Sequence, residues 1–203
     1  MKTLDNKKQY LNSKGLMQTF LDKEFLKGKV FCDYNTKIKE NSNYTILHSL
    51  FLWIHKNIKI SRDRDFNSKH KFRRNAKEIW ESGMATGCTD YAIVFATLSR
   101  QLGIPTTILH TMSEKFVNNL NNNQCGPHTG HAFCECFYDG KWILIDPANH
   151  MFIGEYDEKI ISLNYEVNGE KIFFPCDRNV DLKKQSIEEF NNNMDLLCEN
   201  LKL

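Results

Sequence analysis

The segment from His131 to Asp146 constrains the fold of this chain more than any other stretch. Two runs rich in aromatic and aliphatic side chains, HAFCECFY and KWILID, flank the dipeptide Asp139-Gly140. Asp-Gly supplies the positive φ angles of a two-residue type I′ turn, whose twist matches that of antiparallel strands. The sequence therefore predicts a β-hairpin over these residues.

A buried helix precedes this hairpin. Residues 89–102, TDYAIVFATLSRQL, carry apolar side chains nearly all round the helix axis and stop before Gly103, which suits a left-handed cap. The other periodic segments predict helices at 16–26, 45–59, 75–82 and 186–201, a strand at 106–110, and a second hairpin at 160–174 around Asn168-Gly169. Helices followed by antiparallel strands indicate an α+β fold, with the N-terminal helices packed on an antiparallel sheet.

Two further segments have no regular apolar period and are expected to be loops. Residues 61–74 are polar and basic, and we interpret them as a solvated surface loop, with a clamp for an acidic substrate as the alternative. Residues 112–130 are rich in Asn and lie immediately before His131. This second segment is therefore a candidate gate that carries substrate selectivity.

Length, charge and cysteine count bound the class of protein. At 203 residues the chain can bury most of its apolar surface around one core, so we expect a single domain over 1–203. A formal net charge of +2 argues against a nucleic-acid or membrane partner, and no stretch approaches the roughly 18 apolar residues of a membrane span. With no apolar leader and an odd count of seven cysteines, we expect a cytoplasmic protein with reduced thiols, with export by a route without a cleaved signal as the alternative. The oligomeric state stays open.

Cys88 is the candidate nucleophile. It follows Gly87 at the predicted start of the buried helix, where amide N–H groups and the positive end of the helix dipole stabilise a thiolate. The backbone N–H of Cys88 is also a candidate donor to a transition-state oxyanion, and the sequence identifies no second donor. Most free cysteines are buried structural thiols, so the interpretation depends on the partners of this one.

The predicted hairpin supplies two such partners. With a two-residue turn, Phe133 faces Asp146, which makes His131 and Asp146 diagonal neighbours on one sheet face. Diagonal Cα atoms are roughly 7 to 8 Å apart, a separation that an imidazole and a carboxylate can bridge. Asp146 then orients His131, whose other nitrogen takes the proton of Cys88. A three-residue loop would instead place Asp146 on the opposite face.

The run GCTDYAIVFATLSRQLGIPTTIL followed by GHAFCECFYDGKWILIDP resembles the transglutaminase-like core domain in spacing and order, over roughly residues 47–149. That family has a nucleophilic Cys at a helix N-terminus, a His that opens a strand and an Asp that ends the next strand. These positions match Cys88, His131 and Asp146 one for one. The resemblance implies a papain-like α+β fold with the nucleophile at the N-terminus of a central buried helix.

The resemblance also implies thiol chemistry on protein or peptide amides through a thioester, without a cofactor. Family members include cross-linking transglutaminases, deamidases, peptidases, peptide N-glycanases and inactive relatives. The sequence shows neither extra domains nor an acidic calcium loop, so it is more similar to a compact bacterial enzyme than to a calcium-switched cross-linker. We expect a hydrolytic peptidase or deamidase, or transglutaminase-type transfer, with a catalytically silent interaction module as the alternative.

A metal-binding protein is a further alternative. Cys125, His128, His131 and Cys134 are spaced three apart and offer the ligand types that zinc prefers. Two features argue against it, because His131 and Cys134 point to opposite faces of the predicted strand and the intervals match no common zinc spacing. We therefore expect no metal.

Two more residues are candidates for the substrate pocket. Trp142 and Glu135 share the predicted sheet face of the triad, although a carboxylate in the middle of a strand is more often a hydrogen-bonded support. His110, His128 and His150 have no spacing that demands a role, and we interpret them as surface or loop histidines.

Overall fold

The computed structural model of the chain describes residues 45–122, 124, 128–149, 151–155, 157 and 162–179. Its helices are α2 (Thr45–Asn57), α3 (Arg64–His70), α4 (Ala76–Ser82), α5 (Cys88–Gln101) and α6 (Glu114–Asn121). Its strands are β1 (Lys59–Ile60), β2 (Met84–Ala85), β3 (Thr106–Ser113), β4 (Ala132–Tyr138), β5 (Lys141–Asp146), β6 (Met151–Glu155), β7 (Leu163–Val167) and β8 (Glu170–Asn179). The helices predicted at 16–26 and 186–201 lie outside the described residues.

Six of the strands form one antiparallel sheet in the order β6-β5-β4-β3-β8-β7, and β1 and β2 form a separate short parallel pair among the helices. Both predicted hairpins are present. The β4–β5 turn has positive φ angles at Asp139 and Gly140, 51° and 79°, and the β7–β8 turn has them at Asn168 and Gly169, 52° and 84°. The α+β prediction is therefore confirmed.

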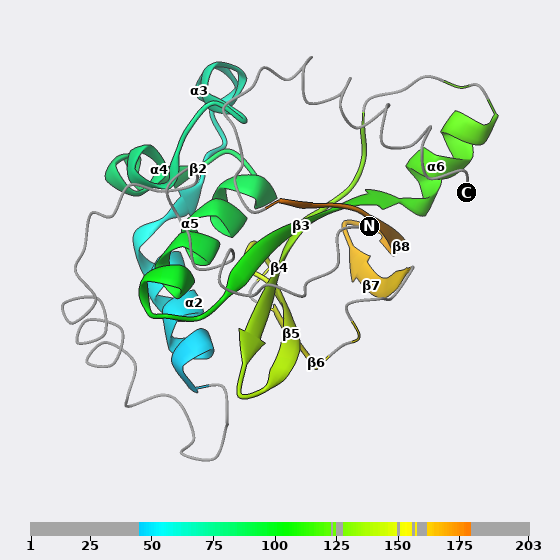
Figure 1. Cartoon of the computed structure of the whole chain (residues 1–203). Helices are drawn as coiled ribbons and strands as arrows, with labels where there is room; N and C mark the ends of the chain where they lie inside the picture. The colour runs from blue at the N-terminus through cyan, green and yellow to red at the C-terminus, as the bar shows by residue number, and fades with distance from the viewer. Residues whose placement is uncertain are drawn as a thin grey trace.

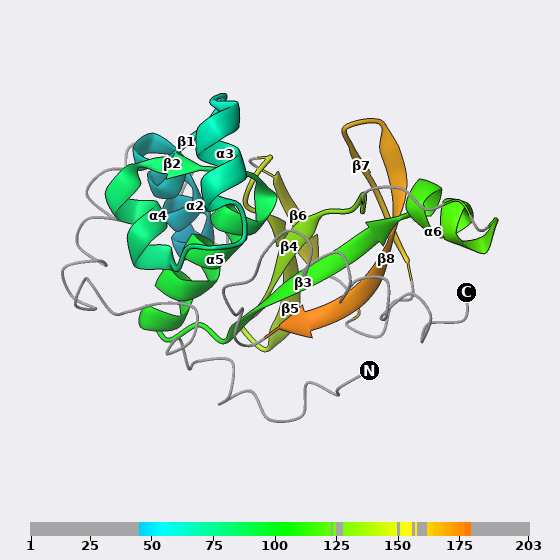
Figure 2. The ribbon, with the colours of Figure 1, turned by 90° about the horizontal axis from the view of Figure 1, so that it is seen from above.

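The helices lie in two regions, one on each side of the sheet (Figure 1). Helix α5 packs against β3 and β4, and α2 and α4 pack against α5 in turn, whereas α6 lies at the other end beside β8. Figure 2 shows the same division from above, with the sheet between the two regions. Among the helices that the structure describes, none combines the length and the apolar character needed to cross a bilayer.

Two apolar clusters hold β4 from opposite faces. The main core joins Phe95 of α5 and Leu47 and Ile54 of α2 to the face of β4 that carries Cys134. A second cluster joins Phe133, on the other face of β4, to residues of β5, β7 and β8. Complete burial of one such side chain stabilises the fold by about 1.5 to 3 kcal/mol. The strand that follows His131 is thus fixed on both sides.

The prediction of a surface loop over 61–74 is wrong in part. Arg64–His70 form α3 because the Asp63 carboxylate accepts hydrogen bonds from two backbone N–H groups of the first turn, at 2.9 and 3.1 Å. Arg74 is 7% exposed, so it does not belong to a solvated face.

The prediction of a loop over 112–130 is also wrong in part. Strand β3 continues to Ser113, and Glu114–Asn121 form α6, where the Ser113 hydroxyl accepts a hydrogen bond from the Phe116 N–H. Phe116 packs against Met112, and this apolar contact gives the helix a buried face. The candidate gate therefore contains a helix anchored at the end of β3.

Candidate active site

Cys88 is the first residue of α5 and is partly exposed. The chain enters the helix from β2 through Thr86 and Gly87, and Gly87 is the N-cap, with an extended φ of 168°. Because a glycine cap has no side chain, the first amide N–H groups of the helix have no side-chain cap, and the positive end of the helix dipole lies at Cys88. The predicted position of Cys88 at the start of a buried helix is confirmed.

His131 and Asp146 form a close pair at the open end of the β4–β5 hairpin. Nε2 of His131 lies 2.9 Å from Oδ1 of Asp146, whose carboxylate is fully buried. The ring N–H is not aimed along the line to that oxygen, so the contact is an ion pair of bent geometry. Nδ1 is then the ring nitrogen that remains for Cys88.

The hairpin register produces this pairing. Tyr138 lies opposite Lys141, and Cys134 lies opposite Ile145. One more step along the ladder places residue 133 opposite residue 146, which makes residue 131 the diagonal neighbour of the carboxylate. The geometry expected from a two-residue turn is therefore the one observed.

The turn after β5 orients the Asp146 carboxylate. Oδ1 accepts the backbone N–H groups of Ala148 and Asn149 at 3.0 and 3.1 Å, and Oδ2 accepts Nδ2 of Asn149 at 2.8 Å. The carbonyl oxygen of the intervening Pro147 contacts Nε2 of His55 from α2. The carboxylate is thus held by its own turn, and the turn is held by a helix.

Strand β3 holds the backbone of His131. The Thr111 hydroxyl donates to the His131 carbonyl at 3.0 Å and accepts from the His131 N–H at 3.3 Å, and the Thr111 N–H donates to the same carbonyl at 3.0 Å. Gly130 permits this close approach, because a Cβ atom at that residue would lie 1.9 Å from the Thr111 carbonyl oxygen. The Phe133 ring then packs edge-on against the imidazole, with centroids 4.8 Å apart.

The partners of Cys88 acidify its thiol. Burial and, to a smaller extent, the Asp146 charge raise the pKa of Cys88, but the hydrogen bond with His131, the imidazolium charge and the backbone N–H of Ala132 together bring it below the ordinary value of 9.0. Burial lowers the pKa of His131, but its contacts with Asp146 and Cys88 raise it to about 10. The opposite shifts favour a thiolate paired with an imidazolium.

The Ala132 amide reaches the sulfur because the strand ladder ends beside it. The Phe137 N–H donates to the carbonyl of Pro105, the residue before β3. Because successive N–H groups of a strand point to opposite sides, the N–H of Ala132, five residues away, points toward β5. If the β4–β5 ladder continued, the Ala132 N–H would donate to the Pro147 carbonyl, but that carbonyl contacts His55 instead. The end of β4 therefore presents an amide donor to the thiolate.

The pocket candidates Trp142 and Glu135 are both buried. Trp142 lies beside the hairpin turn and packs edge-on against Phe137, with ring centroids 5.3 Å apart. Each candidate is four residues along its strand from Asp146 or His131, about 13 Å at the rise of a β-strand. The structure does not bring them next to that pair, and their role in a pocket stays a prediction.

The residues of the alternative metal site have separate surroundings. Cys125 lies outside the described residues. Cys134 is buried in the main core, where its thiol donates to the Ala92 carbonyl at 3.5 Å, whereas His131 pairs with Asp146. In the part of the chain that the structure describes, no group of three or more His, Cys, Asp or Glu side chains is arranged to hold a metal ion.

The histidine interpretation is wrong for His110, which is buried in β3. Burial and the nearby His128 lower the pKa of His110 to about 4. His128 is partly buried against the Phe116 ring, and burial together with the Lys71 charge lowers its pKa to about 4 as well. Both imidazoles are therefore neutral at pH 7. His150 lies outside the described residues.

Three residues that hold the site were not predicted from the sequence. Gly130 had one local signal, its place directly before His131. Thr111 bonds a residue 20 positions away, and Arg74 pairs with Asp90, 16 positions away, so no local pattern identifies either one. Only the folded chain reveals these partners.

The comparisons with known proteins identify the family of this chain. The model of the Transglutaminase-like superfamily matches residues 33–147, more than half of the chain. The chain belongs to this superfamily. Membership supports a cysteine-dependent enzyme and leaves the particular reaction open. No curated protein sequence matches the chain.

Two solved structures are similar to part of this chain. A candidate cysteine protease from Cytophaga hutchinsonii is 18% identical, with a TM-score of 0.49, over 72% of this chain and 43% of its own. A protein described as a TGase is 11% identical, with a TM-score of 0.43, over 71% of this chain and 37% of its own. This chain therefore spans less than half the length of either protein.

Proposed function

We propose that the chain is a cysteine-dependent acyl-transfer enzyme that acts on protein or peptide amides. Cys88 is the nucleophile, His131 the general acid and base, and Asp146 the residue that orients the imidazole. The observation that carries this proposal is the contact of His131 with a fully buried carboxylate, 2.9 Å away, beside a thiol whose pKa is lowered. Membership in the superfamily supports the reaction class.

Acylation begins with the thiolate. The Cys88 sulfur attacks the amide carbonyl carbon, and a C–S bond forms as the carbonyl becomes a tetrahedral oxyanion. When the C–N bond breaks, the imidazolium of His131 gives its proton to the departing amine. A thioester remains on Cys88 and the imidazole is neutral, with its orientation kept by Asp146.

Deacylation reverses these roles. Neutral His131 removes a proton from water, the resulting hydroxide attacks the thioester carbonyl, and the C–S bond breaks to return the thiolate. A primary amine that replaces water gives transfer in place of hydrolysis. Water is present at far higher concentration than any amine, so we assign hydrolysis as the main reaction and amine transfer as the minor one.

The oxyanion needs hydrogen-bond donors aimed at the carbonyl oxygen. The backbone N–H of Cys88 lies at the N-terminus of α5, where the helix dipole adds to its positive charge. Removal of a single donor of this kind costs about 10²- to 10³-fold in turnover in other hydrolases. The proposal assigns this N–H as the first donor.

A digest of denatured casein tests the proposal, because it offers backbone amides and glutamine side chains together. Mass spectrometry separates peptide-bond cleavage from deamidation, and added hydroxylamine converts the acyl-enzyme to hydroxamates. An acid-quenched sample should show the acyl group on Cys88 by intact mass and peptide mapping. We expect products with the parent protein and none with Cys88→Ser.

Cys134→Ser is the matched control, because it removes a thiol that is buried in the main core. This variant should keep the product pattern of the parent. Products that persist in Cys88→Ser would overturn the proposal. If the parent forms no acyl-enzyme, the interaction-module interpretation replaces it.

A further inference from the structure

A buried ion pair lies behind the turn that carries Cys88. Nη2 of Arg74 is 2.6 Å from Oδ2 of Asp90, and the two side chains are 5% and 1% exposed. Asp90 is the third residue of α5, two positions after Cys88. A charge pair this deep in the protein is expensive to desolvate, which calls for a structural or functional reason.

The Asp90 carboxylate closes the turn on both sides of Cys88. Its Oδ2 accepts the backbone N–H of Thr86 at 2.7 Å and the Thr86 hydroxyl at 2.8 Å, in addition to Arg74. The residues that flank the sulfur at positions −2 and +2 are therefore bonded to each other. This link restricts the backbone between them, and with it the direction of the Cys88 side chain.

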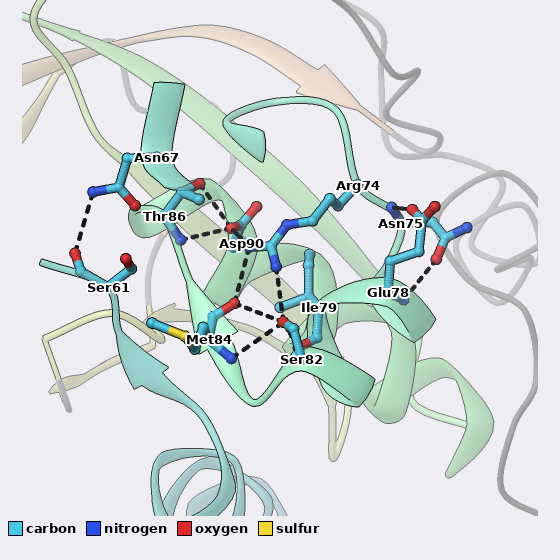
Figure 3. A network of polar contacts seen from close by, with 10 residues as sticks. All are labelled: Ser61, Asn67, Arg74, Asn75, Glu78, Ile79, Ser82, Met84, Thr86 and Asp90. Atoms are coloured by element: carbon cyan, nitrogen blue, oxygen red, sulfur yellow. Dashed lines mark hydrogen bonds and ion pairs between the residues drawn. The ribbon is translucent and has the colours of Figure 1, made fainter. Parts of the chain in front are cut away.

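Arg74 ties this turn to the neighbouring elements. Nη1 donates to the Ser82 hydroxyl at 2.8 Å, and Nη2 donates to the Met84 carbonyl at 2.9 Å. Figure 3 shows Arg74 between the end of α4, strand β2 and the first turn of α5. One guanidinium thus joins three elements at the place where the chain enters the helix of Cys88.

The charges of this network have a consequence for the thiolate. The positive end of a helix dipole stabilises both a carboxylate in the first turn and a thiolate at the first residue. Two anions so placed oppose one another. From the hairpin side, the thiolate also faces the His131 imidazolium, which favours it, and the Asp146 carboxylate, which opposes it. The Arg74 guanidinium at 2.6 Å balances the Asp90 charge.

We propose that Arg74 is a positioning residue for Cys88: it fixes the Thr86–Asp90 turn through Asp90 and cancels a carboxylate charge that would otherwise oppose the thiolate. The inference rests on the proposed function, because it gives the network a purpose only if Cys88 reacts as a thiolate. It predicts that the two partners of the ion pair act on the thiolate in opposite directions.

The pH midpoint of Cys88 alkylation by limiting iodoacetamide, followed by intact mass and peptide mapping, measures this effect. Arg74→Gln leaves Asp90 unbalanced and should raise the midpoint by about one pH unit, which lowers the alkylation rate about tenfold at a pH well below both midpoints. Asp90→Asn removes the opposing charge and should leave the midpoint at or below that of the parent. Arg74→Lys keeps the charge and should restore the midpoint.

Two further variants keep the test decisive if Arg74→Gln folds poorly. Arg74→Gln/Asp90→Asn restores charge balance and should return the midpoint toward the parent value. Lys77→Gln is the matched control, because Lys77 forms an exposed ion pair with Glu81 at 3.7 Å within α4. This variant should keep the alkylation midpoint of the parent.

The direction of the shifts separates a positioning role from a purely structural one. A pair that only stabilises the fold would lower the melting temperature in both single variants and move both midpoints alike or not at all, and that result would overturn the inference. The parent midpoint tests the proposed function separately. An ordinary midpoint in the parent would refute the assignment of Cys88 as the nucleophile. A low midpoint in the parent, with the same midpoint in all variants, would refute only the role of Arg74.

Discussion

Cys88 and the pair formed by His131 and Asp146 reach the candidate site from two regions that hold them by different means. On the Cys88 side, a buried ion pair fixes the turn into α5. On the His131 side, strand register, backbone hydrogen bonds from Thr111 and aromatic packing fix the residues. The backbone beside the thiol is therefore held through a buried ion pair, and the backbone beside the imidazole through strand register and packing.

This difference fits the proposed chemistry of each side. A nucleophilic thiolate requires a favourable potential, which fixed charges and a helix dipole supply. A general acid and base requires its ring to stay within hydrogen-bond reach of two partners, which a rigid sheet supplies. Variants that disturb one means of support and spare the other test whether the two sides differ in this way.

Asp146→Asn should give the largest effect, because it removes the charge that the sheet directs at His131 and leaves a side chain of the same shape. We expect casein-digest turnover to fall by about 10³- to 10⁴-fold, as with loss of the orienting carboxylate in other triads. Asp139→Asn, at the turn of the same hairpin, is the control and should retain parent turnover. A loss below tenfold in Asp146→Asn would contradict the assigned role.

Gly130→Ala should give the next largest effect, and Gly87→Ala is its counterpart on the other side of the site. The new Cβ at residue 130 would lie 1.9 Å from the Thr111 carbonyl oxygen, whereas a Cβ at residue 87 meets nothing within 4 Å. Displacement of His131 should cost about 10²-fold in turnover and about 2 kcal/mol in the free energy of unfolding.

Gly87→Ala should cost no more than about 1 kcal/mol, because its extended φ suits any residue and alanine is only a poorer N-cap. Turnover and urea unfolding, measured for both variants, show whether the loss in Gly130→Ala is the larger. Equal losses in both would mean that the backbone is no tighter before His131 than before Cys88.

Thr111→Val should give the smallest effect, because the Thr111 N–H still donates to the His131 carbonyl at 3.0 Å. Loss of the two hydroxyl bonds should cost about 1 to 2 kcal/mol of unfolding free energy and roughly threefold to tenfold in turnover. Thr97→Val in α5 removes a buried hydroxyl bond to the Ile93 carbonyl at 2.6 Å and is the control. It should lose stability without loss of turnover, and parallel turnover losses in both variants would count against a specific clamp on His131.

The elements predicted from the sequence are those whose signals are local. The Asp139-Gly140 turn alone determines the register that pairs His131 with Asp146. The apolar surface all round α5 predicted its burial. In both cases the interactions that decide the structure lie within about one helix or one hairpin, where short-range patterns are informative.

The elements that were missed depend on partners distant in the sequence or on a weak local signal. Helix α6 had such a signal, Ser113 as its cap followed by Phe116 and Leu120 four residues apart, but the Asn-rich composition obscured it. The two-residue pair of β1 and β2 is too short for any period to show. Arg74 belonged to a basic run, and its burial depends on Asp90, which only the folded chain brings near.

The pH dependence of Cys88 alkylation in the parent and in His131→Ala tests the central claim most directly. A lowered pKa means that the thiolate persists as the pH falls, so the parent should alkylate at Cys88 with a midpoint below the ordinary thiol value of 9.0. Without His131 the burial of the thiol remains and its main stabilising partner is gone, so the midpoint should rise past 9 and the other cysteines should be unaffected. A parent midpoint at or above 9, or the same midpoint in both proteins, would contradict a thiolate–imidazolium pair at this site.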